Sequence, residues 1–348
     1  RVDCLLTVGL PMSLRRLQSW LNESEGSGEP SGGPSNEELV QQLTTHGAIE
    51  DPQIIKGFLA SDRAYFLKHD DDGSEAHPGL ESPETAYADS PMRHGILHLS
   101  APSIYGVALE ALELREGQTF LNVGSGTGYL SSIVANVLGS HSVQYGVECK
   151  PELVAHARSK LDGLGHQHVH LVECNCFALD PEGSMRFERI YVGAGASQRS
   201  ASLLFRLLEV GGICVGPFAA EHGAQRILKV RRVAESSFET TVIMSVQFTP
   251  LVAPWTAGGP GAALTPVLLR PPLWSPATHR HFDGAHRDAV RAVMQLHTCC
   301  DCWLASLPKD VIVQELLPHL EYGSFRPSAT AGGASGASFS KIESLERA

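Results

Sequence analysis

The sequence predicts an α/β fold, in which helices cover both faces of a doubly wound and mostly parallel sheet, followed by a small helical segment. Short apolar runs alternate with helical patterns between residues 119 and 216, which is typical of parallel strands joined by helices. A glycine-rich turn follows the first apolar run, where a strand would pass into a helix. With 348 residues, 43% of them hydrophobic, the chain is long enough for one large core and a small second module.

The N-terminal part is predicted to hold a flexible leader, two helices and a long loop. Gly, Ser, Pro and Glu dominate residues 23–36, and this composition buries too little apolar surface to offset chain entropy. Ser35 or Asn36 can cap the helix that follows, and a second helix is expected at 51–59. Residues 69–93 are polar and rich in Asp, Gly, Ser and Pro, which predicts a long loop.

The central elements follow the alternating pattern. A helix is expected at 103–112 behind Pro102, and a short buried strand at 119–123. The later elements are a helix at 130–138, a strand at 143–147, a helix at 151–161, strands at 169–173 and 189–192, a helix at 201–208 and a strand at 212–216. Residues 237–248 end the series with an alternating, antiparallel-looking pattern.

The C-terminal part begins with a stretch rich in Pro and Gly at 250–276, which indicates a linker or an irregular wrap around the domain edge. Helical patterns return at 285–297 and 308–320. The predicted divisions are a disordered leader at 1–35, the main domain at 36–255, a linker at 256–273, a helical segment at 274–325 and a disordered tail at 326–348.

Composition narrows the classes of partner. The chain has 27 basic and 38 acidic residues, a formal net charge of −11, which disfavours binding to nucleic acid or to an anionic membrane surface. No apolar run approaches the roughly 20 residues that span a bilayer. The eight cysteines are scattered along the chain, which predicts free thiols in a reducing compartment, the cytoplasm. Small molecules and other proteins are the expected partners.

The glycine-rich turn is the most informative motif. Gly124, Gly126 and Gly128 let the backbone turn sharply and approach a ligand without a Cβ in the way. A dinucleotide fold has Gly-x-Gly-x-x-Gly, whereas this chain has Gly-x-Gly-x-Gly. The tighter spacing suits S-adenosylmethionine, whose methionine portion needs close backbone contact and which has no phosphate to neutralise.

Two polar residues at later strand ends extend this predicted cofactor site. Glu148 ends the next strand, where a carboxylate can accept hydrogen bonds from both ribose hydroxyls. Asn175, beyond the third strand, can meet the adenine edge or cap a turn. The candidate cofactor-binding residues are Asn122, Gly124, Ser125, Gly126, Thr127, Gly128, Glu148, Asn175 and Cys176.

Further motifs lie on both sides of the glycine-rich turn. They are Ser-Asp-Arg-Ala-Tyr-Phe at 61–66, Leu-Ser-Ala-Pro at 99–102, Ile-Tyr-Val-Gly-Ala-Gly at 190–195, Gly-Gly at 211–212 and Phe-Thr-Pro-Leu at 248–251. With these motifs, residues 37–255 resemble the protein-L-isoaspartate O-methyltransferase family. The resemblance implies a Rossmann-like, seven-stranded methyltransferase fold that binds S-adenosylmethionine.

The resemblance also implies a reaction, methyl transfer to the α-carboxylate of an isoaspartyl residue in a damaged protein. A carboxylate is ionised at neutral pH, so catalysis needs positioning and exclusion of water rather than a strong base. Ser100 matches the family's active-site serine and would orient the carboxylate through its hydroxyl and amide. The implied substrate-binding residues are His98, Ala101, Pro102, Val192, Gly193 and Ala194. Ser-Ala-Pro also suits a helix start with Pro102 in the first turn, and both roles are expected together.

Three positions depart from the family pattern. His98 replaces a threonine, and Asn122 and Asn175 each replace an aspartate, which removes a charge but keeps a polar side chain. These variants resemble the subgroup of isoaspartate methyltransferase domain-containing proteins, in which the cofactor site is joined to a C-terminal adaptor for a cullin ubiquitin ligase. The alternative function is therefore a catalytically weak receptor that recruits isoaspartyl substrates to a ligase. His98 can hydrogen-bond a substrate carboxylate or simply face solvent.

The C-terminal segment has a short adaptor-like pattern. Leu-Pro-Lys-Asp-Val-Ile at 307–312 opens a helix and faintly resembles an F-box-like or suppressor-of-cytokine-signalling-box-like adaptor; packing of 274–325 onto the main domain is the simpler interpretation. His297 and the cysteines at 299, 300 and 302 suggest zinc, but only one Cys-x-x-Cys is present, so free thiols and no metal are expected. Cys174 and Cys176 are likewise predicted to be strand-end thiols.

Overall fold

The computed structural model divides the chain into two compact units, residues 1–272 and 273–348. The described residues are 35–68, 83–219, 224–253, 264–271, 274–276, 278–282, 284–299 and 303–319. The predicted tail, and all but the last residue of the predicted leader, lie outside these ranges.

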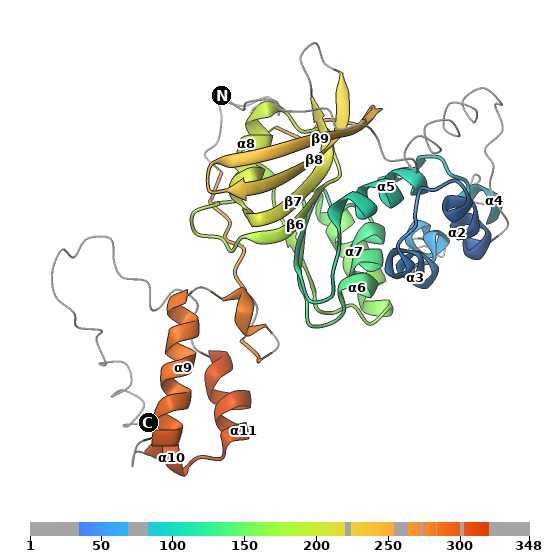
Figure 1. Cartoon of the computed structure of the whole chain (residues 1–348). Coiled ribbons are helices and arrows are strands. Elements are labelled where there is room, and N and C mark those ends of the chain that lie inside the picture. The colour runs from blue at the N-terminus through green and yellow to red at the C-terminus, as the bar shows by residue number, and fades with distance from the viewer. Residues whose placement is uncertain are drawn as a thin grey trace. The chain divides into compact units, whose positions relative to one another are not determined.

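The first unit is built on a seven-stranded sheet with the strand order β5-β4-β3-β6-β7-β8-β9 (Figure 1). Its strands are β3 (Thr119–Val123), β4 (Val143–Glu148), β5 (Val169–Glu173), β6 (Phe187–Val192), β7 (Leu208–Ala219), β8 (Gln225–Ala234) and β9 (Ser237–Val246). The pairs from β5 to β7 are parallel, whereas β8 and β9 are antiparallel to their neighbours. The predicted doubly wound, mostly parallel sheet is confirmed.

The helices of this unit precede the sheet or alternate with its strands. They are α2 (Asn36–Thr45), α3 (Pro52–Ala60), the 3-10 turn η1 (Arg63–Leu67), α4 (Pro83–Ala86), α5 (Pro102–Leu112), α6 (Tyr129–Leu138), α7 (Pro151–Gly163), the 3-10 turn η2 (Cys176–Ala178) and α8 (Gln198–Arg206). Ser35 caps α2 and Asp51 caps α3 through side-chain oxygens that accept backbone N–H bonds. No described helix combines the length and apolar character that a bilayer crossing needs.

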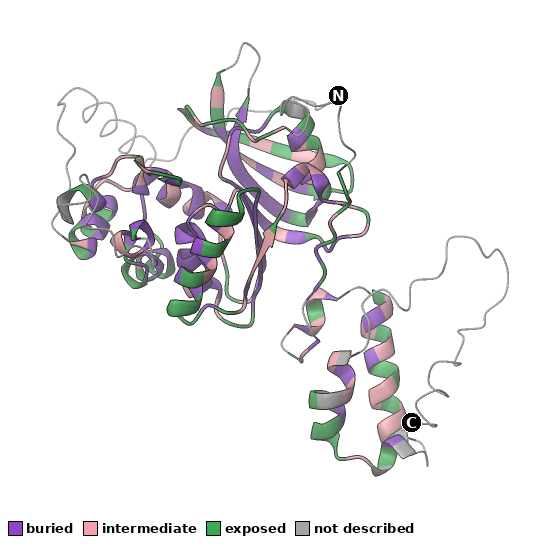
Figure 2. Ribbon diagram, turned by 180° about the vertical axis from the view of Figure 1, so that it is seen from behind, coloured by how far each residue is buried: buried purple, intermediate pink, exposed green. Residues whose placement is uncertain are grey.

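The central strands β3, β4 and β6 are buried on both faces, and residue alternation along them divides the core in two. On β3, Phe120 packs with Leu39 of α2 and Phe58 of α3, together with residues of α5 and α6. Its neighbour Leu121 faces the opposite side, where it packs in a cluster that includes Leu204 of α8. Figure 2 shows the strands buried along the middle of the sheet. Both faces are covered, so the strand ends are where a ligand can enter.

A short hairpin precedes α5 and corrects one prediction. Residues 69–93 were expected to form a loop, but residues 83–86 are helical and Met92 begins β1 (Met92–His94), which pairs with β2 (Leu97–Leu99). Residues 69–82 lie outside the described ranges. Three-residue strands are too short for a periodic pattern, which is why the sequence did not indicate them.

Residues 264–271, which the predicted divisions place in a linker, pack against the rest of the first unit. Val267 forms a bridge with Leu179, and its amide donates to the Ala178 carbonyl at 2.8 Å. Leu269 is buried, and its carbonyl accepts from the Met185 amide at 2.7 Å.

The second unit is helical and has its own apolar core. Its elements are η4 (His279–His281), α9 (Gly284–Cys299), α10 (Trp303–Ser306), α11 (Lys309–Val311), the π-type turn η5 (Ile312–Leu316) and the 3-10 turn η6 (Leu317–His319). The buried core residues are Trp274, Phe282, Val290, Leu304, Ile312 and Leu317. The short helix predicted at 308–320 is found as consecutive helical turns over 309–319, which change from α to π and then to 3-10 geometry beyond Val311. Pro318, which lacks an N–H, falls in the final 3-10 turn.

Candidate active site

The glycine-rich turn joins β3 to α6 and takes a conformation that glycine adopts readily. The φ angles of Gly124, Gly126 and Gly128 are +77°, +53° and +86°, in the left-handed region. A Cβ on Gly124 or Gly126 would meet no atom nearer than 3.9 Å, so conformation rather than crowding requires glycine there. The Gly124 amide donates to the Val147 carbonyl at 2.8 Å, which fixes the turn against β4 and leaves space beside its backbone.

Glu148 ends β4 and binds the glycine-rich turn directly. Its Oε2 accepts from the Gly126 amide at 3.1 Å, and its Oε1 accepts from the Cys149 and Lys150 amides at 2.8 and 3.1 Å. The Cys149 thiol is a fourth donor, to Oε1 at 3.5 Å, so Oε2, which accepts from one amide, is the oxygen with capacity left for a ligand. The structure thus brings Glu148 to the turn as strand order predicted, while its contact with ribose hydroxyls stays a prediction.

Two buried polar atoms at the turn have no hydrogen-bond partner within the described part of the chain. They are Asn122 Oδ1 and Ser125 Oγ. The Asn122 amide nitrogen donates to Ser131 Oγ at 3.0 Å, and Thr127 Oγ1 accepts weakly from the Tyr129 amide at 3.4 Å. Unsatisfied buried polar groups are costly, so a polar ligand at this turn would satisfy groups that the chain leaves unpaired.

The backbone that follows β6 is hydrogen-bonded to the end of β3, next to the glycine-rich turn. The Gly193 amide donates to the Val123 carbonyl at 2.8 Å, and a Cβ on Gly193 would lie 2.9 Å from the Gly124 carbonyl oxygen. The predicted substrate-lining residues 192–194 therefore border the cofactor turn. Val192 is buried in the core, whereas Gly193 and Ala194 are half-buried.

Asn175 caps η2, which is one of the two roles predicted for it. Its Oδ1 accepts from the Phe177 amide at 3.0 Å, and its Nδ2 donates to the Val252 carbonyl at 2.8 Å. The preceding residue, Cys174, donates from its amide to the Glu148 carbonyl at 2.9 Å, so this turn adjoins the end of β4. Contact of Asn175 and Cys176 with adenine stays a prediction.

Ser100 follows the hairpin and is held by internal hydrogen bonds. Its amide donates to Tyr105 Oη at 3.0 Å, and its carbonyl accepts from Arg63 Nη2 at 3.3 Å. The Ser100 amide, which was expected to orient substrate, thus donates to Tyr105 in this structure, and its contact with substrate stays a prediction. The Ser100 side chain is buried beside Tyr105, and contact of its hydroxyl with substrate stays a prediction.

The start of α5 also differs from expectation. Pro102 is the first helical residue as predicted, but the N-cap is Ala101, which gives no side-chain hydrogen bond. Instead Asp89 Oδ1 accepts from the Ser103 amide at 2.7 Å, so the protein's own carboxylate occupies a helix-terminal donor. Burial raises the pKa of the Asp89 carboxyl. Ala101 and Pro102 thus position the chain beside Ser100, and their contact with substrate stays a prediction.

Arg63 is a fully buried residue to which sequence reasoning gave no role. Its guanidinium donates to the carbonyls of Ala86, Ala88 and Ser90 at 2.9, 2.7 and 2.8 Å, and to that of Ser100. Burial lowers the pKa of the Arg63 guanidinium. Arg63 thereby ties the 86–90 segment to the residue expected to contact substrate. Its place in the 61–66 motif was the only signal in the sequence.

His98 lies exposed on β2, with its carbonyl oxygen 3.9 Å from the position that a Cβ on Gly126 would take. The hairpin that carries Ser100 therefore passes beside the glycine-rich turn. Burial, followed by the charges of Arg93 and Lys150, lowers the pKa of the His98 imidazole, which favours its neutral form. A neutral imidazole can donate one hydrogen bond and accept another.

The structure describes the side chains of four cysteines and shows whether potential metal-binding side chains lie together. Cys149, Cys174, Cys176 and Cys214 are free thiols, which confirms the prediction for Cys174 and Cys176. Within the described ranges no group of three or more His, Cys, Asp or Glu side chains is placed to hold a metal ion. The cysteines at 300 and 302 lie outside those ranges.

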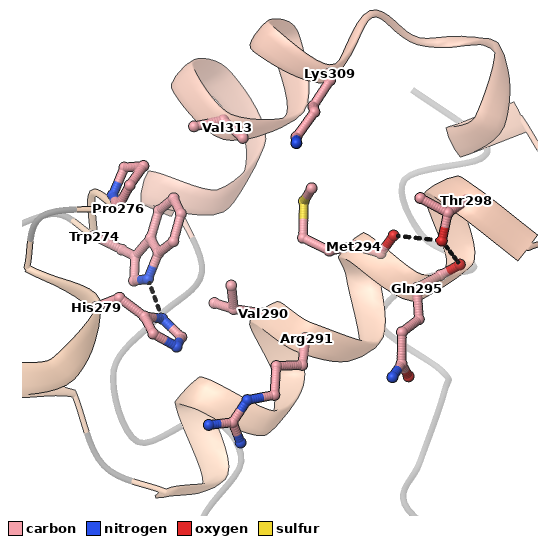
Figure 3. A pocket seen from close by; sticks show the side chains of 10 residues that line it. All are labelled: Trp274, Pro276, His279, Val290, Arg291, Met294, Gln295, Thr298, Lys309 and Val313. Carbon is pink, nitrogen blue, oxygen red and sulfur yellow. Dashed lines mark hydrogen bonds between the residues drawn. The ribbon is translucent and has the colours of Figure 1, made fainter.

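The second unit contains a cavity of about 700 Å³ (Figure 3). Trp274, Val290 and Met294 supply apolar lining, and the Trp274 indole N–H donates to His279 Nδ1 at 2.9 Å. Arg291 also lines the cavity, although Asp288 pairs with it at 2.5 Å. The cavity is mainly apolar with basic side chains beside it.

A doubly wound sheet, a tight glycine turn and an acid at the end of the next strand together define a Rossmann-like methyltransferase. A model of the family described as protein-L-isoaspartate(D-aspartate) O-methyltransferase matches residues 34–255. The chain belongs to this family and is a methyltransferase enzyme.

Relatives and solved structures agree with this assignment. An Ignicoccus hospitalis protein-L-isoaspartate O-methyltransferase is 30% identical over 216 residues, which cover 62% of this chain and 96% of the relative. A Pelobacter propionicus protein-L-isoaspartate O-methyltransferase 2 is 33% identical over 215 residues, 62% of this chain and 88% of the relative. A Plasmodium falciparum structure, described as a beta-aspartate methyltransferase in complex with S-adenosyl-L-homocysteine, is 22% identical with a TM-score of 0.52. That match covers 63% of this chain and 99% of that one, and it supports the fold.

Proposed function

We propose that this chain transfers a methyl group from S-adenosylmethionine to the α-carboxylate of L-isoaspartyl residues in damaged proteins. The observation that carries the proposal is the passage of the Ser100 hairpin beside the glycine-rich turn, with the His98 carbonyl 3.9 Å from a Cβ position on Gly126. A substrate group held by Ser100 would thus lie near a donor held by the turn.

The residues at the turn fit the methyl donor. The left-handed glycines leave space at the backbone, and Asn122 Oδ1 and Ser125 Oγ are buried and unpaired among the described residues. Glu148 is positioned to accept hydrogen bonds from sugar hydroxyls. When bound, the donor supplies an electrophilic methyl group.

The substrate side needs positioning more than proton transfer, because a carboxylate is already ionised at neutral pH. The Ser100 hydroxyl would donate to that carboxylate. Arg63 and Tyr105 fix the Ser100 backbone, which restricts where the hydroxyl points. Holding the reactants in one geometry can supply several kcal/mol of a barrier. His98 is a second donor on the same hairpin.

The proposal is tested by measuring transfer of labelled methyl groups to an isoaspartyl peptide and to its ordinary aspartyl counterpart. We expect transfer to the isoaspartyl peptide alone. Ser100→Ala should lower kcat/KM about 10- to 100-fold, because a hydrogen bond to a charged group contributes roughly 1.5–3 kcal/mol. The matched control is Ser140→Ala, at an exposed serine after α6. Transfer to neither peptide, with S-adenosylhomocysteine still bound, would contradict the enzyme proposal.

That last outcome would favour a second proposal, in which the chain is a receptor and residues 274–325 are an adaptor for a cullin ubiquitin ligase. The helical unit has its own core, an apolar cavity and a partly exposed Val311, as a docking element would. Intact chain mixed with a purified elongin or Skp-type adaptor protein should elute as a complex, and Met294→Glu should abolish it. Separate elution of the unmodified chain would refute the adaptor role.

The cytoplasm remains the proposed location. The free thiols of Cys149, Cys174, Cys176 and Cys214 support a reducing compartment.

A further inference from the structure

The β1–β2 hairpin presents two basic side chains together on its exposed face. Arg93 and His98 are directly opposite each other in the antiparallel register, and such partners project from the same face. Both are exposed, whereas Leu97 and Leu99 on the other face of β2 are buried. The arrangement leaves Arg93 and His98 available to a molecule that approaches the hairpin.

Arg93 and His98, which together form the basic face, lie near two parts of the candidate active site, the glycine-rich turn and the end of β6. The His98 carbonyl approaches the glycine-rich turn, as described above. Arg93 Nη2 donates to Thr249 Oγ1 at 3.3 Å, and the Thr249 carbonyl accepts from the Gly195 amide at 2.9 Å. Gly195 follows the β6 end that borders the cofactor turn. Arg93 is therefore held between the Ser100 hairpin and the end of β6.

Lys150 adds a second permanent charge. It follows Glu148 by two positions and is exposed at the start of α7, and its charge acts on His98 together with that of Arg93. Within the described residues, neither Arg93 nor Lys150 forms an ion pair with a carboxylate. Arg93 and Lys150 therefore have no direct ion-pair partner among the described residues, although the formal net charge of the whole chain is −11.

Cations without an ion-pair partner beside a substrate site favour anionic groups, through both encounter rate and local ion pairing. We propose that Arg93 and Lys150 make this enzyme prefer isoaspartyl sites that carry a further carboxylate, an acidic side chain within a residue or two of the isoaspartyl linkage. The preference rests on the proposed function, since it concerns which isoaspartyl peptides enter that site. His98 would add a hydrogen bond to the same carboxylate.

The test compares two isoaspartyl peptides that differ only in one flanking residue, glutamate or glutamine. KM and kcat are measured with the intact chain, and Kd is measured by fluorescence anisotropy of labelled peptides with S-adenosylhomocysteine present. Exposed ion pairs change an equilibrium by up to about fivefold each, so two cations should favour the glutamate peptide about 3- to 20-fold, in KM and Kd. Added salt should reduce this ratio.

Three variants show whether the basic face causes the preference. Arg93→Gln and Lys150→Gln should each move the ratio of the two peptides toward one. Lys56→Gln removes an exposed charge from α3 and should keep the wild-type ratio. A wild-type ratio near one, or a ratio that neither active-site variant alters, would overturn the preference. Absence of methylation with the Kd ratio intact would instead contradict the proposed function alone, because anisotropy reports peptide selection without turnover.

Discussion

Replacement of Glu148 by glutamine should weaken binding of S-adenosylhomocysteine by about 10- to 100-fold. Backbone amides donate to both carboxylate oxygens, the Gly126 amide on one side and the Cys149 and Lys150 amides on the other. A glutamine NH₂ in either orientation would face an N–H donor. Hydrogen bonds to ionised acceptors contribute roughly 1.5–3 kcal/mol, against about 0.5–1.5 for neutral ones. Losing this difference at the turn and at the sugar hydroxyls amounts to about 1.5–3 kcal/mol of binding free energy.

Calorimetric titration of the intact chain with S-adenosylhomocysteine measures this loss. The matched control is Glu173→Gln, because Glu173 ends the neighbouring strand β5, is the register partner of Glu148 and is exposed. Thermal unfolding without ligand shows whether the substitution loosens the turn itself. If Glu148→Gln binds within threefold of wild type while folded, the assigned role of this carboxylate is refuted.

The remaining predictions concern stability. Arg63→Met leaves buried carbonyls without a donor and should lower the free energy of unfolding by about 3 kcal/mol in urea titrations; a loss under about 1 kcal/mol would contradict the structural role. Gly128→Ala should lower the melting temperature more than Gly165→Ala. Both glycines have positive φ, but only at Gly128 would a Cβ be crowded, 3.1 Å from its nearest neighbour. Equal losses in the two variants would argue against crowding. Burial opposes ionisation of Glu113, but hydrogen bonds from two basic side chains of β8 outweigh it and lower its pKa to about 2. Its stabilising effect should therefore be full above pH 4.5 and fade as pH falls toward 2, so that wild type and Glu113→Gln converge in stability at acid pH; a constant difference would contradict this.

The sequence indicated the geometry of the glycine-rich turn and its neighbour Glu148, because local rules govern both. Glycines after a buried strand indicate a left-handed turn, and the Glu148 position follows from the order of parallel strands. The structure brings this carboxylate to the Gly126 amide. Both the fold class and the neighbour of the turn, Glu148, were therefore predictable from the sequence pattern.

The substrate half was less accessible, because long-range contacts to backbone atoms organise it. Arg63 binds carbonyls between 23 and 37 positions away, and Asp89 caps a helix that begins well beyond it. Neither bond has a periodic signal in the sequence. The hydrogen bond from the Ser100 amide to Tyr105 also has no signal in the sequence. Tyr105 lies one helical turn into α5, and the direction of its side chain depends on packing.

The edges of the fold show the limit of periodicity. The strand β8 (Gln225–Ala234) was not predicted, because Lys and Arg occupy positions along it and mask the apolar alternation. The hydrogen bonds that Lys229 and Arg231 donate to Glu113 explain why this strand tolerates those charges. In the second unit, the sequence indicated a helix at 308–320. It did not indicate the change from α-helical to π-type turns beyond Val311.

The most direct test of the account is a crystal structure of the intact chain with S-adenosylhomocysteine and an isoaspartyl peptide. The account predicts sugar hydroxyls within hydrogen-bond distance of the Glu148 carboxylate, about 2.7–3.0 Å, and the peptide α-carboxylate at the Ser100 hydroxyl. A nucleoside bound away from the Gly124–Gly128 turn, or a peptide carboxylate that does not reach Ser100, would contradict it.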